Sequence, residues 1–301
     1  MKPRNAGVAQ TNGMDLAYED FGPEDGVPLI LIMGLGAQLV FWPDALVGRL
    51  VGEGFRAIRF DNRDIGLSTK LHGQGVPKLP WLILRALIGF PPRVPYLLTD
   101  MARDTVGLMD ALGIERAHIV GASMGGMIAQ LVAIHFPERV LTLTSIMSTT
   151  GSRRLPRPDR ELLQLLAGPR PATDDRAALI EAGVHLVKAI GTPDNGASDD
   201  ERRALVTRAI DRGYYPEGPQ RQLAAIIASG SRRKPLRRVK APTLVLHGTA
   251  DRLVPPAGGK DTAKRVPGAR LEWLEGMGHD LPGAYIPRIA ALIAQHAKQV
   301  R

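Results

Sequence analysis

The stretch Arg116-Ala-His-Ile-Val-Gly-Ala-Ser-Met-Gly-Gly-Met-Ile-Ala-Gln130 joins a strand to a helix through a sharp turn. The apolar run His118–Val120 has the length and character of a buried strand, and the apolar residues after the turn suffice for a buried helix. Between them, Ser123 stands between Gly121 and Gly125, which fits the pattern G-x-S-x-G. In this pattern a strained backbone makes the serine hydroxyl project, and the flanking positions come too close to their neighbours for side chains. The stretch therefore predicts an exposed nucleophilic serine.

This turn resembles the nucleophile elbow of the α/β-hydrolase family. The resemblance covers nearly the whole chain and is carried also by the Gly34 turn, the Asp61–Ser68 turn, Phe136–Arg139 and the loops around Asp251 and His279. The segments most similar to the aclacinomycin methylesterase-like, carboxylesterase branch are Asn62–Asp64, Gly121–Gly125 and Gly276–His279. The resemblance implies an α/β-hydrolase fold, with a mostly parallel central sheet flanked by helices. It also implies hydrolysis of a carboxylic ester without a metal or cofactor.

Three residues follow the order serine, acid, histidine that this family shows. Ser123, Asp251 and His279 each lie just past the carboxyl end of a predicted strand, and such positions converge on one crevice in an open α/β sheet. Acyl transfer by a serine needs a base to take its proton and a carboxylate to orient the base. We therefore expect Ser123 as nucleophile, His279 as base and Asp251 as the orienting acid. Asp261, in a predicted helix, and Asp280, beside the histidine, are the alternatives for the acid.

Acyl transfer also needs N–H donors for the oxyanion. In many family members the strand before the first glycine turn ends in His-Gly, and the next residue donates a backbone N–H. Here Met33-Gly34 departs from that pair. Because the donor is a main-chain N–H, replacing the histidine side chain does not remove it. The resemblance therefore implies that the N–H of Leu35 is this donor. The alternative is that Gly34 and Gly36 form an ordinary turn between a strand and a helix. The second expected donor is the N–H of Met124, directly after the nucleophile.

The segment Asp61–Ser68 resembles the family's D-x-R-G-x-G-x-S turn, with Asp64 where glycine is usual. Asp and Asn favour tight turns through bonds from side chain to backbone, and Arg63 can pair with a carboxylate. We expect a structural role for this turn, with catalysis by Asp61 or Asp64 as the alternative.

Apolar patterns outline the rest of the core. Met14–Phe21 alternates apolar and polar residues as an edge strand would, and Pro28–Met33 is continuously apolar as a central parallel strand would be. Further strands are predicted at Phe55–Phe60, Val140–Met147, Ala241–His247 and Ala269–Leu274. Helices are predicted at Trp42–Glu53, Thr99–Leu112, Met127–Ile134 and Ile286–Val300.

Residues 151–234 change in composition, becoming rich in arginine and proline without a strand pattern. Four helices are expected there, with starts near Pro158, Thr173, Ser198 and Pro219, and Ser198–Glu201 matches a capping box. The expected organisation is a core of residues 1–150 and 235–301, with 151–234 as a helical cap after the strand that follows the nucleophile helix. The cap needs the core surface to bury its apolar faces.

The stretch Lys70–Leu98 is too long and too apolar for a plain loop. Within it, Leu79–Phe90 predicts a short amphipathic helix, either part of a lid or an ordinary helix on the core. If apolar side chains of these insertions line the crevice, the substrate is an uncharged, hydrophobic ester. The candidate lining residues are Trp81, Leu82, Ile83, Leu84, Leu87, Ile88 and Phe90 from this stretch, and Leu186, Val187, Ile226 and Ile227 from the cap.

Composition sets outer bounds on the function. The chain of 301 residues contains no cysteine, which excludes disulfides, thiolate chemistry and cysteine-ligated zinc. The formal charge is +9, but aromatic residues are only 5%, too few to form stacking platforms for nucleic acid. The basic cluster at Arg232–Lys240 is either a solvated connection or a weak attraction for anionic surfaces or substrates. Neither a signal peptide nor a membrane span is evident, so we expect a cytoplasmic protein. The sequence does not decide between a monomer and a homodimer.

Other functions fit the same residues. Lactone opening, C–C bond hydrolysis, acyl transfer and cofactor-free perhydrolysis use the same three side chains. A serine at the elbow argues against the dehalogenases and epoxide hydrolases of this fold, which use an aspartate there. A small-molecule sensor with a retained pocket is the remaining alternative to an enzyme.

Overall fold

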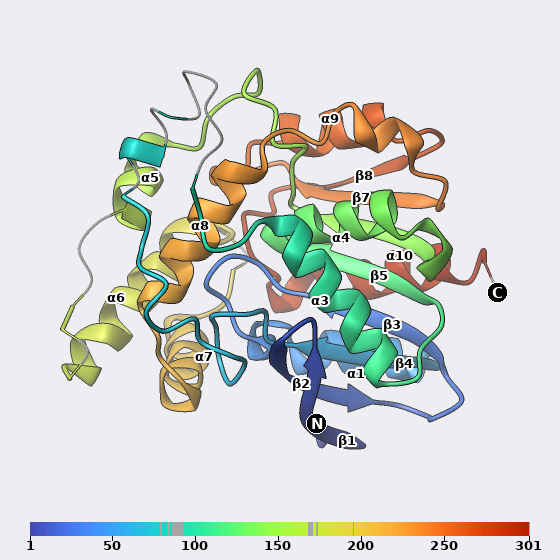
Figure 1. Cartoon of the computed structure of the whole chain (residues 1–301), viewed down its shortest axis with the longest axis horizontal. Coiled ribbons are helices and arrows are strands. Elements are labelled where there is room, and N and C mark those ends of the chain that lie inside the picture. Colours follow the sequence, from blue (N-terminus) through green and yellow to red (C-terminus); the bar gives the residue numbers. More distant parts are fainter. Residues whose placement is uncertain are drawn as a thin grey trace.

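The computed structural model describes residues 1–78, 80–82, 85, 93–167, 171–172, 174–194 and 196–300, and a sheet of eight strands lies at its centre (Figure 1). The strands are β1 Asn5–Thr11, β2 Met14–Phe21, β3 Val27–Ile32, β4 Phe55–Phe60, β5 Ala117–Ala122, β6 Val140–Ile146, β7 Thr243–Gly248 and β8 Arg270–Leu274. They lie in the order β1-β2-β4-β3-β5-β6-β7-β8. β2 is antiparallel to both of its neighbours, and all other pairs are parallel. The predicted, mostly parallel sheet is confirmed.

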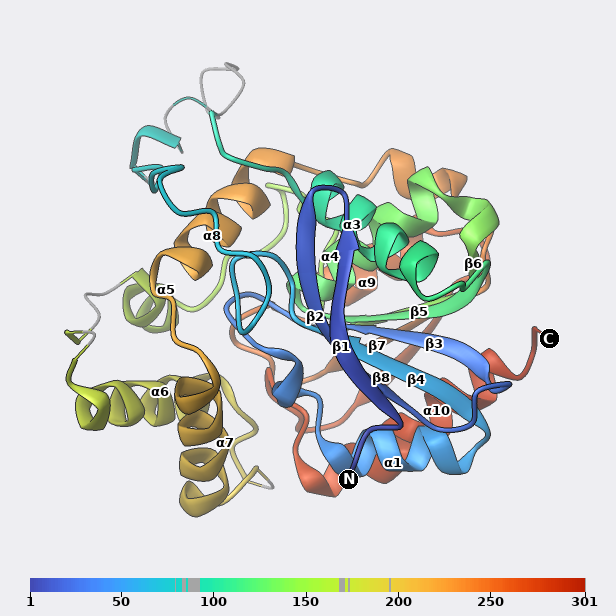
Figure 2. The ribbon, with the colours of Figure 1, turned by 60° about the horizontal axis from the view of Figure 1, so that its bottom comes forward.

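Helices cover both faces of the sheet (Figure 2). On one face lie α3 Leu98–Ala111 and α4 Met124–His135, and on the other lie α1 Asp44–Gly52 and α10 Ile286–Ala297. The sheet is flanked further by α9 Ala257–Arg265, and short 3₁₀ turns form η1 Leu39–Phe41, η2 Pro137–Arg139, η3 Pro235–Arg238 and η4 Gly283–Tyr285.

The strand β3 shows why the central sequence is continuously apolar. Its Ile30 and Ile32 pack in the apolar cluster that contains α3 and α4, whereas Leu29 and Leu31 pack in the cluster that contains α1 and α10. All four are fully buried. Because successive side chains of a strand point to opposite faces, a strand covered on both sides needs apolar residues throughout.

The prediction that Met14–Phe21 is an edge strand was wrong. This strand, β2, is paired on both sides, and β1 forms the edge. Five of the seven residues of β1 are exposed, so the strand carries no apolar alternation from which it could be predicted.

In the described part of the segment between β6 and β7 lie four helices, which we call the cap helices. They are α5 Arg160–Ala167, α6 Arg176–Ile190, α7 Asp199–Arg212 and α8 Glu217–Ser229, and they gather at one side of the sheet (Figures 1 and 2). Their starts lie close to the four predicted ones. The predicted capping box is confirmed, since Ser198 Oγ accepts from Glu201 N at 3.2 Å and Glu201 Oε2 accepts from Ser198 N at 2.7 Å.

Two ion pairs attach the cap helices to the Asp61–Ser68 turn of the core. Arg221 of α8 and Asp64 are both fully buried, with Nε 3.0 Å from Oδ2. Arg212 of α7 pairs with Asp61, which also accepts the backbone N–H of Leu39 at 2.7 Å. Asp64 has a φ of +67°, which lies in the left-handed region that Gly, Asn and Asp adopt more readily than other residues. This geometry supports the structural role expected for the turn.

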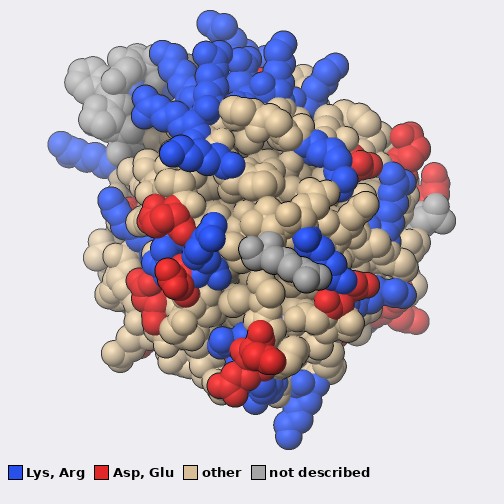
Figure 3. Space-filling model, turned by 90° about the vertical axis from the view of Figure 1, so that its right-hand side faces the viewer, with Lys and Arg blue, Asp and Glu red and all other residues tan. Residues whose placement is uncertain are grey.

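Lysine and arginine side chains gather at the top of the face in Figure 3, the side of the molecule where α9 lies in Figure 1. Residues 231–240 and 257–268, which hold η3 and α9, contain nine lysines and arginines but a single acidic residue, Asp261. This acid is buried and pairs with Arg233 and Arg265. Most of the net charge of +9 is therefore concentrated in two short segments.

Over the described ranges, no helix combines the length and the hydropathy that crossing a membrane requires.

Candidate active site

Ser123 occupies a strained position between β5 and α4. Its φ of +55° and ψ of −119° fall outside the regions that non-glycine residues usually adopt. The turn is possible only with glycine on both sides, because a Cβ at Gly121 would collide with the Gly125 carbonyl and a Cβ at Gly125 with the Ile32 carbonyl. The strain leaves Ser123 partly exposed although its neighbours in the chain are buried.

The structure brings together the three residues that the sequence analysis combined. His279 Nε2 lies 2.9 Å from Ser123 Oγ, and His279 Nδ1 lies 2.7 Å from Asp251 Oδ2. Both distances are typical of hydrogen bonds. The two bonds connect the serine hydroxyl to the imidazole and the imidazole to the carboxylate. The three residues come from the ends of β5, β7 and β8, and between β5 and β7 the chain forms β6 and the cap helices.

Asp251 is buried, but its environment favours the ionised form. Burial alone would raise the pKa of the carboxyl. The attraction of His279 and the hydrogen bond from its ring, together with the nearby His247 and the Val254 N–H, lower the pKa by more, so that it lies below its ordinary value. Its Oδ1 accepts two backbone N–H groups, from Leu253 at 2.9 Å and Val254 at 2.8 Å. A carboxylate held in this way can orient a histidine and balance its positive charge.

The carboxylates of the two alternative acids are hydrogen-bonded to threonine hydroxyls. Asp261 accepts the Thr150 hydroxyl at 2.7 Å, and Asp280 Oδ1 accepts the Thr192 hydroxyl at 2.6 Å. In the described part of the chain, His279 Nδ1 has Asp251 as its carboxylate partner.

The expected oxyanion donors border the serine. Met124 is the first residue of α4, and its N–H directly follows Ser123 in the chain. A Cβ placed on Gly34 would lie 3.0 Å from Ser123 Cβ, so the segment that contains Leu35 passes close to the nucleophile. Among the described residues, neither the Leu35 N–H nor the Met124 N–H donates a hydrogen bond to another group.

The buried side chain of His247 also lies beside Asp251, and the sequence analysis assigned it no role. His247 Nε2 lies 2.8 Å from the Val254 carbonyl and 3.5 Å from Asp251 Oδ2. Because His247 belongs to the buried run of β7, its sequence context indicated only a strand. Its position four residues before Asp251 was the available signal.

The apolar residues proposed to line the pocket differ in exposure and in the groups against which they pack. Trp81 is exposed and Leu82 is buried, whereas Ile83, Leu84, Leu87, Ile88 and Phe90 lie outside the described residues. Val187 is partly buried and packs with Ile180, Val184 and Val206 in a cluster between α6 and α7. Ile226 and Leu35 are partly buried against the apolar cluster that contains Met124.

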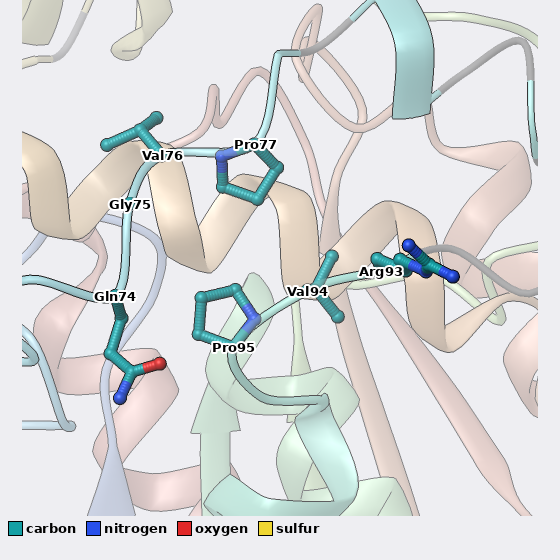
Figure 4. Close-up of a pocket in the computed structure, with 7 residues that line it drawn as sticks. All are labelled: Gln74, Gly75, Val76, Pro77, Arg93, Val94 and Pro95. Atoms are coloured by element: carbon teal, nitrogen blue, oxygen red, sulfur yellow. The ribbon is translucent and has the colours of Figure 1, made fainter.

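A separate pocket lies between two segments of the long insertion (Figure 4). Its volume is about 360 Å³, and it is lined by Gln74, Gly75, Val76, Pro77, Arg93, Val94 and Pro95. It lies beside α8, since Arg221 donates to the Gly75 carbonyl at 3.3 Å. None of Ser123, Asp251 and His279 lines it, so this pocket is distinct from the candidate active site.

Comparison with known proteins places this geometry in a family. The family described as "alpha/beta hydrolase fold" matches residues 27–282. Rhodomycin D methylesterase DnrP from Streptomyces peucetius is 30% identical over 307 residues, covering 93% of this chain and 94% of that protein. The meta-cleavage product hydrolase CumD from Pseudomonas fluorescens IP01 has a similar structure, with a TM-score of 0.76, 22% identity and 97% coverage of both chains. The enol-lactonase from Burkholderia xenovorans LB400 has a TM-score of 0.70 and 23% identity, over 97% of this chain and 98% of that one. At 22% and 23% identity these solved structures establish only the fold. The family match over residues 27–282 and the 30% identical relative establish the family. The chain belongs to the α/β hydrolase family.

Proposed function

We propose that this chain is a serine hydrolase that cleaves carboxylic esters of uncharged, fairly hydrophobic small molecules through an acyl-enzyme intermediate. The observation that carries the proposal is the line of hydrogen bonds from Ser123 Oγ to His279 and from His279 to Asp251. The 30% identical relative, named a methylesterase, supports an ester as the substrate.

In the proposed reaction, Ser123 Oγ attacks the ester carbonyl while His279 Nε2 accepts the hydroxyl proton. The oxygen of the tetrahedral intermediate receives hydrogen bonds from the N–H groups of Leu35 and Met124. His279 then gives its proton to the departing alcohol. A water molecule, activated by the same histidine, hydrolyses the acyl-enzyme and restores Ser123.

Asp251 fixes the tautomer of His279 that this reaction requires. With Nδ1–H donating to the carboxylate, Nε2 is left with a lone pair toward Ser123. When Nε2 gains a proton, the ionised Asp251 stabilises the resulting positive charge.

The preference for hydrophobic esters rests on the side chains beside the oxyanion segment. Leu35 and Ile226 keep part of their surface exposed and pack on the cluster that holds Met124. Apolar side chains there would receive an apolar acyl or alcohol group better than a charged one, because binding would remove apolar surface from water.

A panel of chromogenic esters with acetyl, butyryl, hexanoyl and longer acyl groups tests the proposal. We expect kcat/KM to climb several-fold per carbon at first, since each buried methylene contributes up to about 0.8 kcal/mol, and then to fall once the pocket is full. Ser123→Ala should abolish turnover of every ester. A preference for acetyl or for charged acyl groups would contradict the apolar pocket, whereas full activity of Ser123→Ala would contradict the enzyme assignment.

A further inference from the structure

The peptide group that carries the Leu35 N–H lies between two peptide groups that are held by side chains. Before it, the Met33 carbonyl accepts Asn62 Nδ2 at 2.9 Å. After it, the Gly36 N–H donates to Gln222 Oε1, also at 2.9 Å. Peptide groups are planar units that rotate about the Cα atoms, so fixing both neighbours limits the orientation of the unit between them. The Gly34 carbonyl of the same peptide group also accepts the Ala37 N–H, at 3.3 Å. Gln222 therefore contributes to the direction of the Leu35 N–H by holding the peptide group that follows it.

Gln222 comes from the cap helix α8, and its own orientation is set at both ends. Its side chain is fully buried, and its Nε2 donates to the Arg63 carbonyl at 2.9 Å. Rotating the amide by half a turn would place donor against donor and acceptor against acceptor, so only one orientation satisfies both contacts. The neighbouring Arg221 anchors the same turn of α8 to Asp64.

The loop that carries His279 is held by the cap helices in a similar way. Just past the end of α6, Thr192 Oγ1 accepts the Gly278 N–H at 2.9 Å and donates to Asp280 Oδ1 at 2.6 Å. The His279 N–H donates to the carbonyl of Ile190, the last residue of α6, at 2.8 Å. The residues on both sides of the proposed base are thus bonded to the cap segment.

We propose that Gln222 and Thr192 are positioning residues, through which the cap helices hold the oxyanion segment and the histidine loop in their reactive geometry. This inference rests on the proposed function. It implies that α6 and α8 act as parts of the active-site framework. A movement of either helix away from the core would break the hydrogen bonds that orient the Leu35 N–H or the His279 loop.

Gln222→Met, with Gln220→Met as the matched control, tests the first contact. Gln220 is exposed on the same helix, and among the described residues its side chain donates to the Pro216 carbonyl at 3.3 Å. We expect Gln222→Met to lower kcat about 10- to 100-fold while KM changes less than about threefold, because oxyanion contacts tighten in the transition state. Affinity for a trifluoromethyl ketone, whose adduct with Ser123 carries an oxyanion, should fall by a similar factor.

Thr192→Val tests the second contact, with Thr207→Val on α7 as the control. Valine has nearly the same shape but cannot accept from the Gly278 N–H, which is left buried without a partner. We expect kcat to fall about tenfold or more, with KM nearly unchanged. Thr192→Ser, which restores the hydroxyl, should return kcat to within about threefold of wild type, as a purely steric role of Thr192 would not predict.

Amide hydrogen exchange gives a readout that does not depend on turnover. Exchange over residues 33–37 should accelerate in Gln222→Met and not in Gln220→Met, and exchange over 276–280 should accelerate in Thr192→Val and not in Thr207→Val. Unchanged kcat and unchanged exchange in Gln222→Met and Thr192→Val would overturn the inference even if Ser123→Ala is inactive. If Ser123→Ala is active, the proposed function fails, and the exchange data alone still decide whether the cap helices hold these segments.

Discussion

The buried ion pair between α8 and the Asp61–Ser68 turn gives a stability prediction that can be worked from the structure. Both side chains are fully buried, and Arg221 Nε and Nη2 lie 3.0 Å and 3.3 Å from the two carboxylate oxygens of Asp64. At an effective dielectric constant of about 20, opposite unit charges 3 Å apart attract by roughly 5 kcal/mol. Arg221→Met removes this attraction but leaves the Asp64 carboxylate buried, with the Leu71 N–H at 2.8 Å as a remaining donor. Breaking buried pairs in this way costs about 3–5 kcal/mol, and we expect a loss of that size in the free energy of unfolding.

Urea denaturation of four proteins measures this loss: wild type, Arg221→Met, Asp64→Asn and the double variant. Asparagine tolerates the positive φ of Asp64 and carries no charge, so it removes the uncompensated carboxylate without straining the turn. The double variant should recover at least about 2 kcal/mol relative to Arg221→Met. The contact of Arg221 with the half-exposed Glu217 should add little, since solvent screens such pairs. A loss below about 1 kcal/mol in Arg221→Met, or a double variant no more stable than it, would refute this reasoning.

Two further predictions concern pH and the proposed acid. Burial, with a smaller contribution from His296, lowers the pKa of His118 to about 4. Because a histidine in the unfolded chain titrates near 6.5, the unfolded chain binds one more proton than the folded chain between these two pH values. The free energy of unfolding should therefore fall by up to about 3 kcal/mol as the pH drops from about 6.5 to 4. His118→Gln should lose clearly less stability over that range in urea titrations, and an unchanged pH dependence would contradict the assignment. Asp251→Asn should lower kcat at least about a hundredfold, measured with the best ester of the panel, because the amide no longer stabilises a charged His279. Full activity of this variant would assign the acid role to another residue.

Those parts of the fold that depend on local patterns could be predicted from the sequence. β3 is buried on both faces, and its unbroken apolar run indicated that position. The glycines around Ser123 indicated the turn, because the close approach of backbone at those two positions excludes side chains. The edge strand β1 could not be predicted, since five of its seven residues face solvent and only two buried positions, Ala9 and Thr11, constrain its sequence.

Contacts between distant segments could not be predicted in the same way. Gln222 and Gly36 are separated by 186 residues, and Thr192 and Gly278 by 86. No periodicity links such residues, because each side chain is selected by a neighbour that only the folded chain supplies. Ser123, Asp251 and His279 could be combined in advance because they follow the family's order of serine, acid and histidine, and because each follows a predicted strand end of one sheet.

Covalent labelling with a fluorophosphonate tests the central claim most directly, namely that Ser123 is a nucleophile activated by His279. Trypsin releases residues 117–139 as one peptide, in which Ser123 is the only hydroxyl-bearing residue, so mass spectrometry locates the adduct without ambiguity. We predict one adduct per chain on this peptide, with loss of esterase activity in proportion. Labelling should be absent in Ser123→Ala, slowed at least about a hundredfold in His279→Ala and unchanged in Ser231→Ala, which alters an exposed serine. An adduct on another peptide with loss of activity, or ester hydrolysis that persists in Ser123→Ala, would contradict the account.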